Sequence, residues 1–92
     1  METKKVIITV IGEDRVGIIA AVAKALADQR VNILDISQTI LGDFFTMMLI
    51  GDISQSRLGI RELQEALKAL GEEIGMSIQA QHEDIFRFMH RV

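Results

Sequence analysis

Residues 11–20, IGEDRVGIIA, lie between a short β-branched run and a longer alanine-rich run. Two glycines, Gly12 and Gly17, enclose two acids and an arginine. Glycine allows backbone conformations and close approaches that other residues disfavour. The stretch is therefore predicted to be a turn that joins a strand to a helix, and its composition makes it a candidate ligand site.

The run before this turn, KKVIITVIG at 4–12, predicts a central strand. It is short and rich in β-branched residues, which is typical of strands. Strands that are apolar on both faces lie inside a sheet. Here Val6, Ile8 and Val10 fall on one face, and Ile7 and Ile11 fall on the other.

The run after the turn predicts a helix over residues 15–29. Ile19, Val22, Ala23 and Leu26 follow the i, i+3, i+4, i+7 spacing of a helix face. Five alanines in the same range favour a helix that packs closely. Asp14 is expected to be its N-cap.

The remaining elements are two strands, a helix and a last strand. Residues 31–42 and 44–53 are predicted to pair as a hairpin through Gly42 and Asp43. In the first of these strands Leu34, Ile36 and Ile40 are expected to share a face with Asn32 and Gln38. A helix is predicted over 57–74, capped by Ser54 or Ser56 and ended by Gly71 or Gly75. Residues 76–82 alternate as in an edge strand, with Met76, Ile78 and Ala80 inward.

This order predicts an α+β, ferredoxin-like βαββαβ fold: a four-stranded antiparallel sheet with two helices on one face. Residues 1–92 are expected to be a single domain, with a core at 4–82 and a short helical tail at 83–92. The tail carries an apolar stripe of Ile85, Phe88, Met89 and Val92. Because helices cover only one face, apolar sheet surface remains, which favours a homodimer or larger homo-oligomer.

Composition excludes several classes of partner. Thirteen acids against ten Lys and Arg give a net charge of −3, which offers no field for nucleic acid or an anionic membrane. No apolar stretch approaches the ~18 residues of a membrane span. There is no cysteine, so thiol chemistry and thiolate metal sites are excluded. These features favour the cytoplasm.

Known catalytic and metal motifs are incomplete in this chain. Gly12 to Gly17 has the glycine spacing of a P-loop, but Ile18-Ile19 replace the required Lys-Ser/Thr. HEDIF at 82–86 begins like a zinc-protease motif, but Phe86 replaces the second histidine. His82 and His90 are the only histidines. We therefore expect no metal, no cofactor and no enzymatic activity.

Other binding modules of this shape also fail to match. RNA-recognition sheets stack bases on aromatics at alternate strand positions, whereas Phe44 and Phe45 are adjacent and face opposite sides. Copper chaperones need Cys-x-x-Cys, which is absent. The acylphosphatase loop is not matched either, which disfavours an enzyme of that kind.

The chemistry of the residues offers two candidate positions for a site, of which the turn is the better one. Amides at about residues 16–18, at the start of a helix, attract an anion, and Arg15 adds positive charge. The negative charges of Glu13 and Asp14 oppose the binding of an anion. The alternative is that Asp14 only caps the helix and Gly17 only allows close packing. Asn32 could bind an ammonium and a carboxylate, or it could only satisfy the backbone.

Residues 12–38, GEDRVGIIAAVAKALADQRVNILDISQ, resemble the opening of an ACT domain. They are similar to the ACT modules of glycine-cleavage regulators and formyltetrahydrofolate deformylases, which often have Pro where this chain has Val16. The whole chain, with its HEDIFRFMHR tail, resembles stand-alone ACT proteins of unknown role.

The resemblance implies a regulatory module that binds an amino acid between two chains. On this pattern the ligand-binding residues are Asp14, Arg15, Val16, Gly17, Ile18, Asn32 and Ile33. Such a module would act by changing its assembly, or its binding to an enzyme, when the ligand is present. The alternative is a ligand-free interaction module that docks a metabolic enzyme or regulator.

Overall fold

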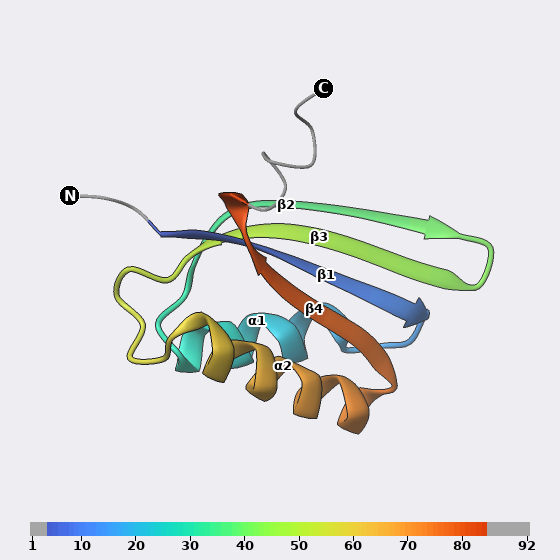
Figure 1. Cartoon of the computed structure of the whole chain (residues 1–92). Helices are drawn as coiled ribbons and strands as arrows, with labels where there is room; N and C mark the ends of the chain where they lie inside the picture. Colours follow the sequence, from blue (N-terminus) through green and yellow to red (C-terminus); the bar gives the residue numbers. More distant parts are fainter. Residues whose placement is uncertain (1–3, 85–92) are drawn as a thin grey trace.

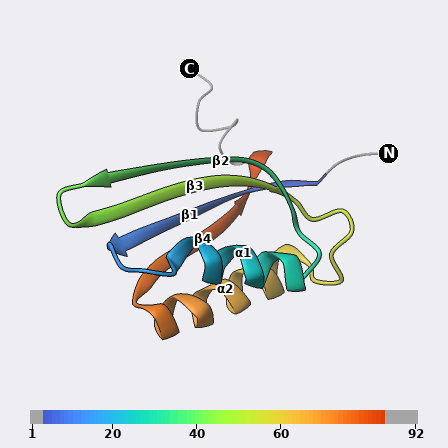
Figure 2. The ribbon, with the colours of Figure 1, turned by 180° about the vertical axis from the view of Figure 1, so that it is seen from behind.

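The structure of the protein, a computed structural model, describes residues 4–84. It consists of β1 (Lys5–Glu13), α1 (Ile18–Asp28), β2 (Asn32–Leu41), β3 (Phe44–Asp52), α2 (Ile60–Ile74) and β4 (Met76–His82). The predicted βαββαβ order is confirmed, and both helices lie on the same side of the sheet (Figures 1 and 2).

The four strands form one sheet in the order β2-β3-β1-β4, and each neighbouring pair is antiparallel. β1 pairs on both sides, so the prediction that it is central is confirmed. β2 and β4 are the two edges. The β2–β3 hairpin extends beyond the helix layer at the end that carries Gly42 and Asp43 (Figures 1 and 2).

The core lies between the sheet and the helices, and it follows the strand alternation. Ile8 faces Leu49 on one side and Ala80 on the other, and all three are buried. The predicted inward positions of β4 are confirmed, because Met76, Ile78 and Ala80 are buried. In β1 the face formed by Val6, Ile8 and Val10 is the buried one. Val22 and Leu26 of α1 and Leu63 and Leu67 of α2 close the core. Full burial of such a side chain stabilises the fold by roughly 1.5–3 kcal/mol.

The start of α1 differs from the prediction. The helix begins at Ile18 instead of 15, and its N-cap is Gly17 with φ 91°, a left-handed conformation. The prediction that Asp14 is the N-cap is therefore wrong. The first intrahelical bond runs from the N–H of Ala21 to the carbonyl of Gly17 at 2.9 Å, so the cap is a backbone turn that needs no side chain.

The start of α2 was also predicted wrongly. The helix begins at Ile60 with Gly59 as N-cap, and no side-chain cap is described. Ser56 Oγ instead accepts from the N–H of Leu58 at 3.1 Å, because a short hydroxyl readily closes a local turn. At the other end, Gly75 with φ 75° is the C-cap, as predicted, whereas Gly71 is buried inside the helix.

A β-bulge in β2 overturns the predicted face of that strand. The register shifts between Ile33 and Asp35, so Asn32 lies opposite Asp52 while Ile36 lies opposite Leu49. Successive residues alternate faces, and the shift therefore places Asn32 and Ile36 on opposite sides of the sheet. Glu83 and Asp84 are helical. The apolar stripe predicted for the tail lies at 85–92, outside the described residues.

Candidate ligand-binding site

The turn between β1 and α1 is attached to the tip of the β2–β3 hairpin. The backbone N–H of Asp14 donates to the carbonyl of Asp43 at 2.8 Å. The side chain of Val16 is fully exposed, at 102%. An apolar side chain held so far into solvent contributes nothing to the core, which makes it available to a ligand or a second chain.

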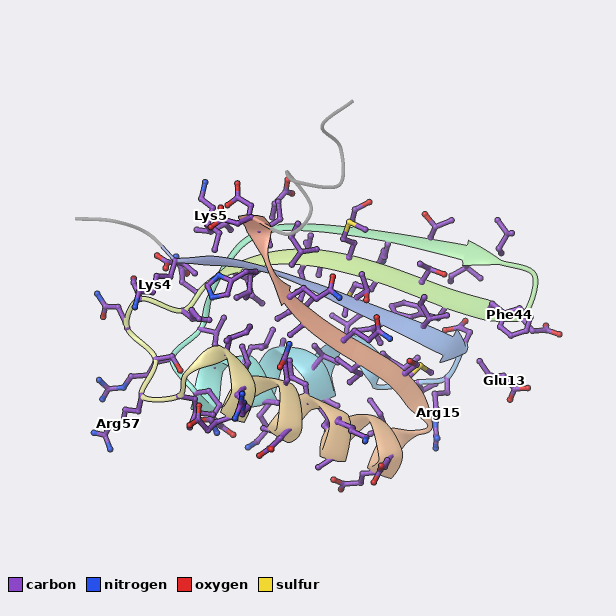
Figure 3. All side chains as sticks on the ribbon, viewed as in Figure 1. Lys4, Lys5, Glu13, Arg15, Phe44 and Arg57 are labelled. Atoms are coloured by element: carbon purple, nitrogen blue, oxygen red, sulfur yellow. The ribbon has the colours of Figure 1, made fainter. Side chains whose placement is uncertain are left out.

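Arg15 has a partner within the chain. Its Nη1 donates to the carbonyl of Ile74 at 2.8 Å, at the end of α2, and Figure 3 places Arg15 beside that end. A helix C-terminus carries partial negative charge, so the guanidinium stabilises it. Arg15 also lines a pocket of about 170 Å³ together with Val16, Gly17, Ile18, Glu73 and Ile74.

Gly17 is required for its backbone conformation. A Cβ at this position would meet nothing within 4 Å, so the alternative in which Gly17 only allows close packing is wrong. The first turn of α1 contains no acidic residue, and no side-chain cap is described there. Ile18 is 3% exposed, so its side chain belongs to the core and is not available to a ligand. The amides of this first turn remain a candidate anion site.

Asn32 lies at the opposite end of the sheet. It pairs with Asp52, which pairs with Lys5, whereas Glu13, next to the turn, pairs with Phe44. Figure 3 shows Lys5 and Glu13 at the two ends of β1. Eight residue steps of strand separate these ends by roughly 26 Å. A single chain therefore does not bring Asn32 and Ile33 to the turn at 14–17.

The β2 edge is open, and it is apolar. All ten residues of β2 are exposed. Five of the large exposed apolar side chains lie on it: Ile33, Leu34, Ile36, Ile40 and Leu41. The other edge differs, because Gln64 Nε2 of α2 donates to the carbonyl of Ala80 in β4 at 2.6 Å. A free, apolar edge strand is a template for pairing with another chain.

The sequence did not reveal the partners of the turn, namely the carbonyls of Asp43 and Ile74. Backbone groups carry no sequence signal, and both lie far from the turn along the chain. Within residues 4–84 no three His, Cys, Asp or Glu side chains are grouped to hold a metal ion. No helix in that range has the length and apolarity needed to cross a membrane.

The fold and the site thus define the class of protein: a ferredoxin-like module with an exposed strand-to-helix turn and an unpaired β2 edge. The ACT domain family model matches residues 4–81, and the chain belongs to the ACT domain family. A UPF0237 protein of Methanocaldococcus jannaschii is 47% identical over 88 residues, which cover 96% of this chain and 98% of that protein.

Three solved structures show the same likeness. An ACT domain protein from Streptococcus pneumoniae has a TM-score of 0.83 and 38% identity, covering 92% of this chain and 96% of that one. A glycine cleavage system transcriptional repressor, described as putative, has a TM-score of 0.77 and 26% identity, and this chain covers 47% of its length. A formyltetrahydrofolate deformylase from Pseudomonas syringae, at 21% identity and a TM-score of 0.81, shares the fold. The predicted family resemblance is confirmed.

Proposed function

We propose that this protein is a non-catalytic, cytoplasmic regulatory module that binds an amino acid between two copies of the chain. The observation that carries the proposal is the separation of the two predicted half-sites. Asn32 and Ile33 lie at one end of β2, and the turn at 14–17 is bonded to Asp43 at the other end. Two copies are needed to bring these half-sites together.

The free edge of β2 supplies a way to do so. If β2 pairs antiparallel with β2 of a second copy about a two-fold axis, the start of each strand lies beside the end of the other. Asn32 of one chain then lies near the hairpin tip of its partner, to which the partner's turn is bonded. The same pairing covers Ile36 and Ile40, which are 45% and 56% exposed.

The chemistry of the two halves suits an amino acid. The carboxylate would meet the first-turn amides of α1, which favour an anion. The ammonium would meet the Asn32 amide oxygen or the carboxylate of Asp14. Val16 and Ile33, both apolar and exposed, would contact the side chain. Binding would stabilise the dimer and so alter what it docks, an enzyme or another regulator.

A thermal-shift screen with the common amino acids is the first test. A ligand that binds only the folded dimer raises the melting temperature. If none of them does, the alternative of a ligand-free interaction module is favoured instead.

A complementation experiment then tests whether the site is shared between chains. Val16→Asp places a negative charge where the turn would contact the ligand, and Asn32→Ala removes the amide. Each variant alone should lose binding of the amino acid found in the screen. In a mixed dimer, the turn of one variant and Asn32 of the other are both intact. Calorimetry on an equal mixture should therefore recover about a quarter of the wild-type sites, because half of the dimers are mixed and each holds one intact site. No recovery would contradict a site that is shared between two chains.

A further inference from the structure

The sheet has a second exposed surface, which the proposed dimer does not use. We call the side of the sheet away from α1 and α2 the open face. Ile7 and Ile11 of β1 and Met48 and Ile50 of β3 lie on it, because their strand neighbours point into the core. Ile11 is 49% exposed and Met48 is 46% exposed. Together they form a partly exposed apolar patch, interrupted by Thr9 and Thr46, and such a patch favours a covering partner.

The chain leaves the sheet next to this surface. β4 ends at His82, opposite Val6, and Gln81 lies opposite Ile7. Glu83 and Asp84, which follow directly, are helical. The C-terminal residues therefore start from the end of the open face that carries Ile7 and Ile50, which face each other across β1 and β3.

The length of the C-terminal segment matches one half of the open face. Ten residues, 83–92, follow β4. As a helix they would be about 15 Å long. Four residue steps along β1 separate Lys5 from Thr9, roughly 13 Å, and Thr9 lies opposite Met48. A helix of this length reaches Met48 and stops before the hairpin tip at Phe44.

The sequence pattern also agrees. Ile85, Phe88, Met89 and Val92 have the i, i+3, i+4, i+7 spacing of one apolar helix face. Arg87 and Arg91 fall on the opposite side of such a helix, so they would stay in water when the apolar face packs on the sheet.

We propose that residues 83–92 fold back as a short amphipathic helix over the half of the open face formed by Ile7, Met48 and Ile50 of the same chain. The covering segment removes that half from water and leaves the hairpin end, with Phe44 and Leu41, exposed. The proposal does not rest on the amino-acid site: it concerns β1 and β3, whereas Asn32, which also lies on the open face, belongs to the β2 edge.

A single tryptophan in the full-length chain tests the proposal, because the protein contains no Trp or Tyr. In Phe88→Trp the emission maximum should lie well to the blue of that in denaturant, and it should not change on dilution. Adding Met48→Glu should shift the emission to the red, because a charge replaces the apolar contact. Adding Ile36→Glu is the matched control: Ile36 is 45% exposed but lies on the helix side of β2, and the emission should stay blue.

Three results would overturn the proposal. Emission at the denatured position would mean that the segment is not buried. Emission insensitive to Met48→Glu would mean that it docks elsewhere. A red shift on dilution would mean that the segment, or the open face, is covered by a second copy.

A truncated chain that ends at His82 keeps the test independent of the tryptophan. The truncation exposes Ile7, Met48 and Ile50, so a dye that fluoresces on apolar surface should bind more strongly than to the full chain. Far-UV circular dichroism checks that the truncated protein is folded. Equal dye binding by two folded proteins would contradict the proposal.

Discussion

Asp14 and Asp43 are joined by a backbone hydrogen bond of 2.8 Å between the amide of the first and the carbonyl of the second. Because of this bond, the turn at 14–17 is held both by the end of β1, which it follows in the chain, and by the tip of the β2–β3 hairpin. The turn is therefore presented at the outer end of the open β2 edge. Under the proposed function, a ligand bound at the turn would lie beside a second chain that pairs with that edge.

The first prediction concerns assembly. Ile36→Lys places a charge on the exposed helix side of β2, and desolvating that charge in an interface is costly. The variant should shift from dimer to monomer at micromolar concentration, as measured by multi-angle light scattering. Gln79→Lys, on the β4 edge, is the control and should leave the mass unchanged. A wild-type protein that is strictly monomeric would contradict both this prediction and the shared site.

The second prediction concerns the conformation of Gly17. With φ at 91°, a residue with a Cβ is strained there even though the space is open. Gly17→Ala should lower the free energy of unfolding by about 1–2 kcal/mol, as measured by urea denaturation. Gly17→Asn should cost less, because Asn adopts left-handed conformations more readily. Equal stability of all three proteins would show that the turn relaxes to another conformation.

The left-handed conformation of Gly17 also determines which residue is the better probe of the site. A bulky residue at Gly17 could block the ligand, but the positive φ means that any such variant is also destabilised. Val16 is the better probe because its side chain is fully exposed.

The sequence predicted the fold well because each element has its own periodic pattern. The alternation in β1 and β4 and the helix spacing of Leu63 and Leu67 follow from local burial alone. The prediction failed where backbone geometry decides the outcome: at Gly17, where a left-handed turn replaced a side-chain cap, and at the bulge of β2.

The candidate site was less accessible to sequence reasoning. The position of Asn32 relative to the turn depends on strand direction. Because β1 and β2 are both antiparallel to β3, the start of β2 and the end of β1 lie at opposite ends of the sheet. The division into a core at 4–82 and a tail at 83–92, and the seven proposed ligand-binding residues, stay predictions.

The third prediction concerns acid stability and Asp52. The N–H of Ser54 donates to Asp52 Oδ1 at 2.9 Å, and this bond, with the charge of Lys5 across the sheet, holds the pKa of Asp52 below its usual value. A carboxyl whose pKa is lowered in the folded state stabilises the fold at pH values above its pKa in the unfolded state. This contribution is lost as the pH falls toward the pKa of the folded state. The unfolding free energy should therefore decrease below about pH 4. Urea titrations across that range should show a shallower decrease for Asp52→Asn, and an equally steep one would contradict the assignment.

The last prediction concerns Arg15. Its guanidinium donates to the carbonyl of Ile74, next to Gly75, so it holds the turn against the end of α2. Arg15→Ala removes a charge-assisted bond at an exposed position, and solvent reduces its contribution. We expect the free energy of unfolding to fall by about 0.5–1.5 kcal/mol, as measured by urea denaturation. The same substitution at Arg57, an exposed arginine on the loop before α2, should lower the free energy of unfolding less.

Arg15→Lys separates the two roles of Arg15: a lysine keeps the positive charge but lacks the planar guanidinium. If Arg15 acts through its bond to Ile74, Arg15→Lys should lose stability and amino-acid affinity together. If affinity falls while the unfolding free energy stays at the wild-type value, Arg15 contacts the ligand directly, and its bond to α2 does not position the turn.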